Sequence, residues 1–140
     1  MSNEQSLVRN FIDGEWCDAA DGGRNNLIDP TTGEIYGESV VSTGADVDRA
    51  MAAASAAFDG WKRTTPAKRS LALLKFADAV EAAGDDLMTA ESRNCGKPYD
   101  LHREEEVGPM IDQLRFFAGA ARHLEGKASG EYMDDMTSMI

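Results

Sequence analysis

The hydrophobic period of the chain changes near residue 43 and divides it into a β-rich first part and a helical remainder. In residues 7–41, apolar residues form short runs between turn residues, a pattern typical of strands and hairpins. After residue 43 they recur every three to four positions, as in helices that bury one face. The pattern predicts an α/β protein in which strands come first and helices follow.

Two hairpins are predicted in the first part. The pair Asp13-Gly14 favours the left-handed backbone angles that a tight hairpin turn requires. Pro30 has no N–H to give to a sheet and opens the second turn, which Gly33 closes. The strands expected around these turns cover 11–12, 15–17, 27–29 and 35–41, with a polar connection over 18–26.

Helices are predicted over most of the remainder. Thr43 and Asp46 match a capping box, and Thr65-Pro66 starts a second helix because proline is tolerated in a first turn. Gly84 interrupts that helix, and Pro109 lies either in the first turn of the last helix or at a kink. The helices expected from the spacing run over 46–58, 65–83, 85–95 and 107–124, with ends at Gly60, Gly96 and Gly126.

Three of these helices carry a predicted apolar face, and the chain ends on a predicted strand. The faces consist of Val47, Ala50, Met51, Ala54 and Phe58 in the first helix, Leu73, Phe76, Ala77, Val80 and Ala83 in the second, and Val107, Met110, Ile111, Leu114, Phe117, Ala118, Ala121 and Leu124 in the last. Residues 137–140 read as the opening of a strand. Since no later segment can pair with such a strand, we expect the sequence to be the front of a longer protein.

Composition narrows the classes of function. The 140 residues carry a net charge of −11, and 42% are hydrophobic and 28% charged, which is typical of a folded globular protein. Nucleic-acid binding depends on Lys and Arg, so this charge argues against it. No apolar run approaches the roughly 18 residues of a membrane span. Two cysteines are too few for a disulfide framework, so we expect a cytoplasmic protein with no membrane partner.

The chain contains no complete catalytic constellation. Cys95 is the more suggestive cysteine, but it ends a predicted helix, where the helix dipole disfavours a thiolate, so we interpret it as a small buried residue. His102 with the acidic run 104–106 is the one cluster with metal-ligand chemistry, and we favour a solvated acidic first turn there. Neither a phosphate-binding loop nor a dinucleotide fingerprint is present.

Several short motifs occur in a fixed order along nearly the whole chain. They are FIDGEW at 11–16, DPTTGE at 29–34, DVDRA at 46–50, AF at 57–58 with Trp61, Arg69 with the leucines after it, and GKP at 96–98. Their order and spacing resemble the N-terminal portion of the aldehyde dehydrogenase superfamily. A closer resemblance is to bacterial γ-aminobutyraldehyde (4-aminobutanal) dehydrogenases, on ESRNCGKP at 91–98, FFAGAAR at 116–122, GEY at 130–132 and TSMI at 137–140.

The resemblance implies the domain plan and the chemistry. Residues 1–126 would form the N-terminal part of a Rossmann-like NAD-binding domain, and 127–140 would start the oligomerisation ribbon of a homo-oligomer, a tetramer. The catalytic domain is absent. The family oxidises aldehydes with NAD(P)⁺ through a cysteine thiolate, a water-activating Glu and an oxyanion hole. These groups lie beyond Ile140 in the family, so the resemblance assigns no catalytic or cofactor-binding residue here, and Cys95 does not match the nucleophile.

The resemblance also implies parts of two binding sites. The carbonyl oxygens of Leu27 and Ile28 would hold a monovalent cation together with Asn94, which stands where relatives have an acidic side chain. An amide oxygen can ligate a cation but brings no charge. Glu106, at the entry of the last helix, would hold the ammonium group of an aminoaldehyde substrate, with Asp112 the second candidate.

We therefore expect the N-terminal fragment of an NAD-dependent dehydrogenase that oxidises 4-aminobutanal to 4-aminobutanoate in putrescine degradation. The fragment alone is predicted to be inactive. Two alternatives stay open at this stage. One is a non-catalytic helical binding module derived from this front end, and the other is a dehydrogenase of the betaine-aldehyde type.

Overall fold

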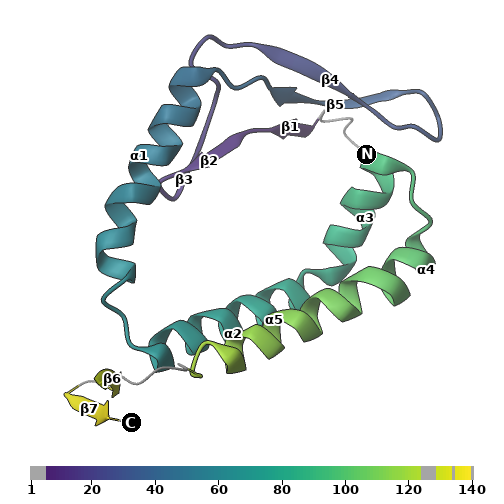
Figure 1. Ribbon diagram of the computed structural model, residues 1–140. Coiled ribbons are helices and arrows are strands. Elements are labelled where there is room, and N and C mark those ends of the chain that lie inside the picture. The colour runs from purple at the N-terminus through teal and green to yellow at the C-terminus, as the bar shows by residue number, and fades with distance from the viewer. Residues whose placement is uncertain (1–5, 124–128, 134, 140) are drawn as a thin grey trace. The chain divides into compact units, whose positions relative to one another are not determined.

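Strands occupy the first part of the chain and helices the middle, in the order that the periodicity predicts (Figure 1). The computed structural model describes residues 6–123, 129–133 and 135–139. The chain forms two compact units. One consists of Met1–Lys62 with Arg93–Gly96, and the other of Arg63–Ser92 with Lys97–Ile140.

The first unit contains a small sheet, a hairpin and a long helix. Their bounds are β1 (Ser6–Val8), β2 (Asn10–Ile12), β3 (Glu15–Cys17), β4 (Arg24–Ile28), β5 (Ile35–Val40) and α1 (Gly44–Trp61). In the sheet, β5 lies between β1, which runs parallel to it, and β4, which runs antiparallel. The pair β2–β3 is the predicted hairpin, with φ of 55° at Asp13 and 81° at Gly14. Both hairpin predictions are confirmed.

Two features of this sheet differ from the prediction. β4 begins at Arg24, so the polar residues 24–26 belong to a strand and not to a connection. An ion pair of 3.3 Å between Arg24 Nη1 and Glu38 Oε2 of β5 supports this extension, and pairing across strands outweighs the weak strand propensity of arginine and asparagine. The hydrophobic pattern does not predict β1, the parallel partner of β5, because a strand of three residues is too short to show an alternation.

The start of α1 is fixed by a buried carboxylate. Asp46 is only 2% exposed, and its Oδ2 accepts a hydrogen bond of 2.9 Å from the Thr43 N–H, as the capping box predicts. Oδ1 accepts a second one, of 3.1 Å, from the N–H of Ala20. Hydrogen bonds from these two backbone groups lower the pKa of Asp46 below its ordinary value. The helix continues to Trp61, so Gly60 does not end it.

The second unit consists of helices followed by a hairpin. Their bounds are α2 (Pro66–Ala82), α3 (Gly84–Cys95, the last turn of which belongs to the first unit), α4 (Tyr99–His102), the π-helical turn η1 (Arg103–Val107), α5 (Gly108–Ala120), β6 (Ser129–Met133) and β7 (Met136–Met139). Thr65 caps α2 by accepting a hydrogen bond of 3.3 Å from the Lys68 N–H, which confirms the predicted start.

Helices α2 and α5 pack along each other (Figure 1). Ala77 of α2 and Ala118 of α5 are fully buried, and small side chains let helices approach closely. Arg115 of α5 donates to Asp78 Oδ1 at 3.1 Å and also to Glu81, both on α2. The apolar core of this unit consists of Met88, Val107 and Ile111, with Val80 and Tyr99 packed against it.

Several predictions for the second unit are corrected. Of the two positions left open for Pro109, the structure has the first turn of α5, directly after the π-helical turn η1, and the helix ends at Ala120 rather than at residue 124. Phe76 and Phe117 are 55% and 59% exposed, so the buried faces are narrower than the predicted stripes. The strand predicted at the end of the chain is confirmed over residues 137–139 as part of β7, and its partner is the preceding strand β6. Leu124, Gly126 and Ile140 lie outside the described residues.

In the part of the chain that the structure describes, no helix combines the length and the apolar character needed to cross a membrane.

Replacing Asp46 by asparagine should lower the melting temperature by a few degrees at neutral pH. The folded-state pKa lies below the ordinary value of 3.8, so the charge stabilises the fold above that pH and the contribution is lost as the pH falls through the folded-state pKa. The deficit of the variant should therefore shrink in acid. Circular-dichroism melts over a pH series measure this, with the exposed Asp48→Asn as the matched control. A deficit that does not change with pH would contradict the charge assignment.

Candidate functional site

The residues predicted to bind ligands fall in different units, and each group is described separately. Leu27, Ile28 and Asn94 belong to the first unit, and Glu106 and Asp112 to the second. The structure brings Asn94 next to the strand pair that contains Leu27 and Ile28, through a residue that the sequence did not single out. That residue is Tyr36.

A β-bulge orients the Tyr36 side chain toward the last turn of α3. Leu27 is opposite Gly37 and Ile28 is opposite Ile35, so Tyr36 is the extra residue on β5. Its hydroxyl lies 3.1 Å from Asn94 Oδ1 and donates to it. The Arg93 guanidinium stacks over the Tyr36 ring, 4.4 Å from the ring centroid. We call Tyr36, Arg93 and Asn94 the aromatic corner.

Gly96 ends α3 beside the second hairpin turn. Its φ is +74°, in the left-handed region, and an added Cβ would lie 3.1 Å from Pro30 Cγ. Glycine is therefore required twice here, by the backbone angle and by the close approach of the turn. This explains physically why GKP and DPTTGE occur together in the motif series. The predicted helix end at Gly96 is confirmed.

Glu106 lies in η1 and is already engaged on both carboxylate oxygens. Oε1 accepts a hydrogen bond from Lys97 Nζ, and Oε2 lies 2.9 Å from Nδ1 of His102. The Lys97 hydrogen bond is the main cause that holds the pKa of Glu106 below its ordinary value. Glu106 is therefore ionised at neutral pH, with its charge balanced by Lys97.

Asp112 has a different environment. It is exposed on α5 and makes no hydrogen bond or ion pair with any residue in the described part of the chain. Its negative charge is thus not balanced by a neighbour in the part of the chain that the structure describes. Glu106 and Asp112 therefore differ in their capacity to attract a cationic ligand, although the resemblance implies the same role for both, with Glu106 as the first candidate and Asp112 as the second.

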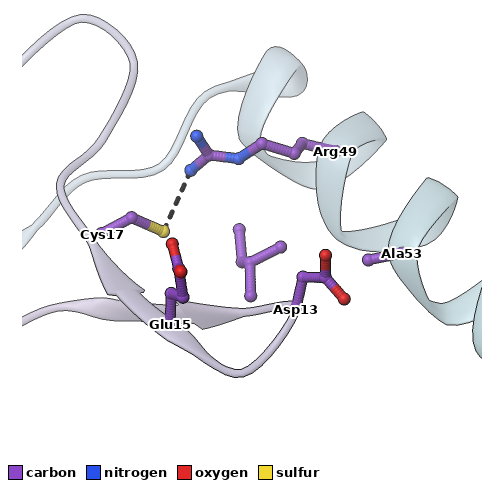
Figure 2. A pocket seen from close by; sticks show the side chains of 6 residues that line it. Asp13, Glu15, Cys17, Arg49 and Ala53 are labelled. Atoms are coloured by element: carbon purple, nitrogen blue, oxygen red, sulfur yellow. Dashed lines mark hydrogen bonds between the residues drawn. The ribbon is translucent and has the colours of Figure 1, made fainter.

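The structure corrects the prediction for Cys95 and gives Cys17 an environment that the sequence did not predict. Cys95 is exposed rather than buried. Cys17 lines a cleft of about 360 Å³ between the β2–β3 hairpin and α1, together with Ile12, Asp13, Glu15, Arg49 and Ala53 (Figure 2). Arg49 Nη2 donates to Cys17 Sγ at 3.1 Å. No sequence signal joined these two residues, which lie 32 positions apart.

The acidic turn around His102 does not form a metal centre in the described structure. Within residues 6–123, 129–133 and 135–139 there is no group of three or more His, Cys, Asp or Glu side chains placed to hold a metal ion. Instead, His102 is nearly buried and contacts Glu106 one helical turn later.

Comparison with known proteins identifies the family. The sequence profile of the Aldehyde dehydrogenase family matches residues 16–140. This chain belongs to the aldehyde dehydrogenase family, and its α/β structure matches the N-terminal portion of solved members. The predicted fold class is confirmed.

The relatives are similar over most of this chain and a small part of their own. A fluoroacetaldehyde dehydrogenase of Streptantibioticus cattleyicolor is 39% identical over 120 residues, which is 86% of this chain and 24% of that protein. An aldehyde dehydrogenase of Paracoccus denitrificans is 38% identical over 128 residues, 91% of this chain and 25% of its own length. The crystal structure of an NAD-dependent aldehyde dehydrogenase from Sinorhizobium meliloti has a TM-score of 0.82 at 34% identity. The match covers 96% of this chain and 27% of that chain. The chain spans about a quarter of the length of the curated relatives it matches.

The replacement Gly96→Ala should lower the free energy of unfolding by about 1–2 kcal/mol, because the left-handed backbone angle is costly for alanine and its Cβ would press on Pro30. The matched control is Gly60→Ala in α1, where a Cβ meets nothing within 4 Å and helix propensity favours alanine by about 0.5–1 kcal/mol. Urea unfolding of the two variants measures both effects. Equal stability of the two variants would contradict the requirement for glycine at residue 96.

Proposed function

We propose that this chain is the N-terminal portion of an NAD-dependent aldehyde dehydrogenase that oxidises 4-aminobutanal to 4-aminobutanoate, a step of putrescine degradation. Family membership over residues 16–140 is the observation that carries the dehydrogenase part of the proposal. The cofactor is proposed from the similar enzyme of Sinorhizobium meliloti, which is NAD-dependent. NAD⁺, when bound, accepts the hydride that leaves the aldehyde carbon.

The contribution proposed for this chain is structural support and substrate selection. Its sequence contains no Gly-x-Gly-x-x-Gly motif, so we assign no NAD contact to it. Residues 1–126 are proposed to belong to the NAD-binding domain and 127–140 to the oligomerisation ribbon of a cytoplasmic homotetramer. The antiparallel pair β6–β7 in that last segment has the form that a ribbon needs.

The proposed preference for an aminoaldehyde rests on negative charge at the start of α5. A substrate that carries an ammonium group is attracted by a carboxylate, whereas an uncharged aldehyde of the same length is not. Glu106 is ionised and held in a fixed orientation, but Lys97 already balances its charge. Asp112 is exposed and carries a charge that no described neighbour balances. We therefore assign both residues to the substrate site, with Asp112 supplying the larger share of the attraction.

The test compares substrates on the full-length enzyme. Asp112→Asn should raise KM for 4-aminobutanal by roughly threefold to tenfold, the range of one partly exposed charge interaction, and leave KM for butanal unchanged. Glu106→Gln should have a smaller effect with the same selectivity. Glu104→Gln, an exposed acid in the same turn as Glu106, is the matched control and should change neither KM.

The outcomes separate the parts of the proposal. Equal effects on the charged and uncharged substrates would remove Asp112 and Glu106 from the substrate site. A wild-type enzyme that prefers fluoroacetaldehyde or butanal to 4-aminobutanal would contradict the proposed aminoaldehyde substrate. The proposed aldehyde dehydrogenase activity would still stand. A full-length protein without any dehydrogenase activity would favour the non-catalytic binding module instead.

A further inference from the structure

The aromatic corner stands where the family resemblance implies a bound monovalent cation. The ligands implied there are the carbonyl oxygens of Leu27 and Ile28 and the side chain of Asn94. All three are neutral. Neutral oxygens alone can bind a monovalent ion when enough of them converge and no other positive charge opposes it. The question is therefore which positive charge the corner already contains.

That charge is the guanidinium group of Arg93 at the last turn of α3. It lies 4.4 Å from the centroid of the Tyr36 ring, within the range of a cation–π contact. Its field also reaches the adjacent hairpin turn. The pKa of Asp29 is lowered, chiefly by hydrogen bonds from the Thr31 side chain and backbone N–H and, to a smaller extent, by the charge of Arg93.

The amide oxygen of Asn94 is also occupied. Its Oδ1 accepts the Tyr36 hydroxyl hydrogen at 3.1 Å, and the β-bulge holds that hydroxyl in place. A metal ion at Asn94 would compete with this hydrogen bond and would approach a permanent positive charge without a formal negative charge among its implied ligands. The residues present do not suit the ion.

We propose that Arg93 is the resident cation of this corner and that the site implied by the resemblance binds no monovalent metal ion. The Arg93–Tyr36–Asn94 contacts fasten the last turn of α3 to β5, which is the structural task that an ion bridging Leu27, Ile28 and Asn94 would perform. This inference is independent of the substrate proposed above.

The first experiment needs no variant. Melting temperatures of the wild-type protein are measured by circular dichroism in KCl, NaCl and choline chloride at equal ionic strength. The expected result is the same melting temperature in all three salts. A saturable rise that is specific to K⁺ or Na⁺ would overturn the proposal, because choline is too large to enter an oxygen-lined ion site.

Two variants test the role of Arg93 itself. Arg93→Met keeps an apolar chain and removes the charge, and it should lower the melting temperature by a few degrees in every salt. Arg63→Met, at an exposed arginine outside the corner, is the matched control and should cause a smaller loss. Equal losses in the two variants would overturn the resident-cation role.

The double variant Arg93→Met/Asn94→Asp restores a carboxylate and removes the competing cation. Its melting temperature should rise in KCl or NaCl relative to choline chloride. No salt-specific rise in a folded double variant would overturn the assignment of Arg93 and Asn94 as the residues that exclude the ion.

Discussion

The buried carboxylate of Asp46 fixes how the start of α1 meets the loop after β3 in the first unit. Among the described residues, Asp46 is the only buried aspartate or glutamate, and a buried charge is costly unless hydrogen-bond donors surround it. The backbone N–H groups of Thr43 and Ala20 and the hydroxyl of Thr43 supply those donors. The start of α1 and the loop after β3 are therefore both hydrogen-bonded to the Asp46 carboxylate. On the two elements that this carboxylate joins, Arg49 of α1 donates a hydrogen bond to Cys17 Sγ of β3.

The same use of polar groups recurs at the positions where a binding site was expected. The carboxylate of Glu106 joins Lys97 to His102 and thereby connects the turn after α3 to η1. Asn94 joins Tyr36 to the end of α3. These groups hold chain segments together, while Asp112 remains exposed. At these predicted positions, the side chains of Glu106 and Asn94 therefore serve as links between chain segments.

Local signals in the sequence were sufficient to predict the features that depend on residues close together in the chain. The Asp13-Gly14 turn, the Thr43–Asp46 cap and the Gly96 helix end each follow from the backbone preference of a few residues. The strand at 24–26 depends on β5, and the contact of Tyr36 with Asn94 joins residues 58 positions apart. No periodicity encodes such contacts. The acidic run 104–106 predicted a charged turn, but its π-helical form and its bond to Lys97 depend on tertiary packing.

The most direct test of this account is whether the chain itself can perform the oxidation. We predict that the purified 140-residue protein forms no NADH from NAD⁺ and 4-aminobutanal above a protein-free blank, because the resemblance assigns no catalytic residue to it and it spans about a quarter of the length of its relatives. The formation of NADH is followed by its absorbance, with Cys17→Ser and Cys95→Ser variants measured in parallel. A saturable rate that requires the protein and disappears in either cysteine variant would contradict the account.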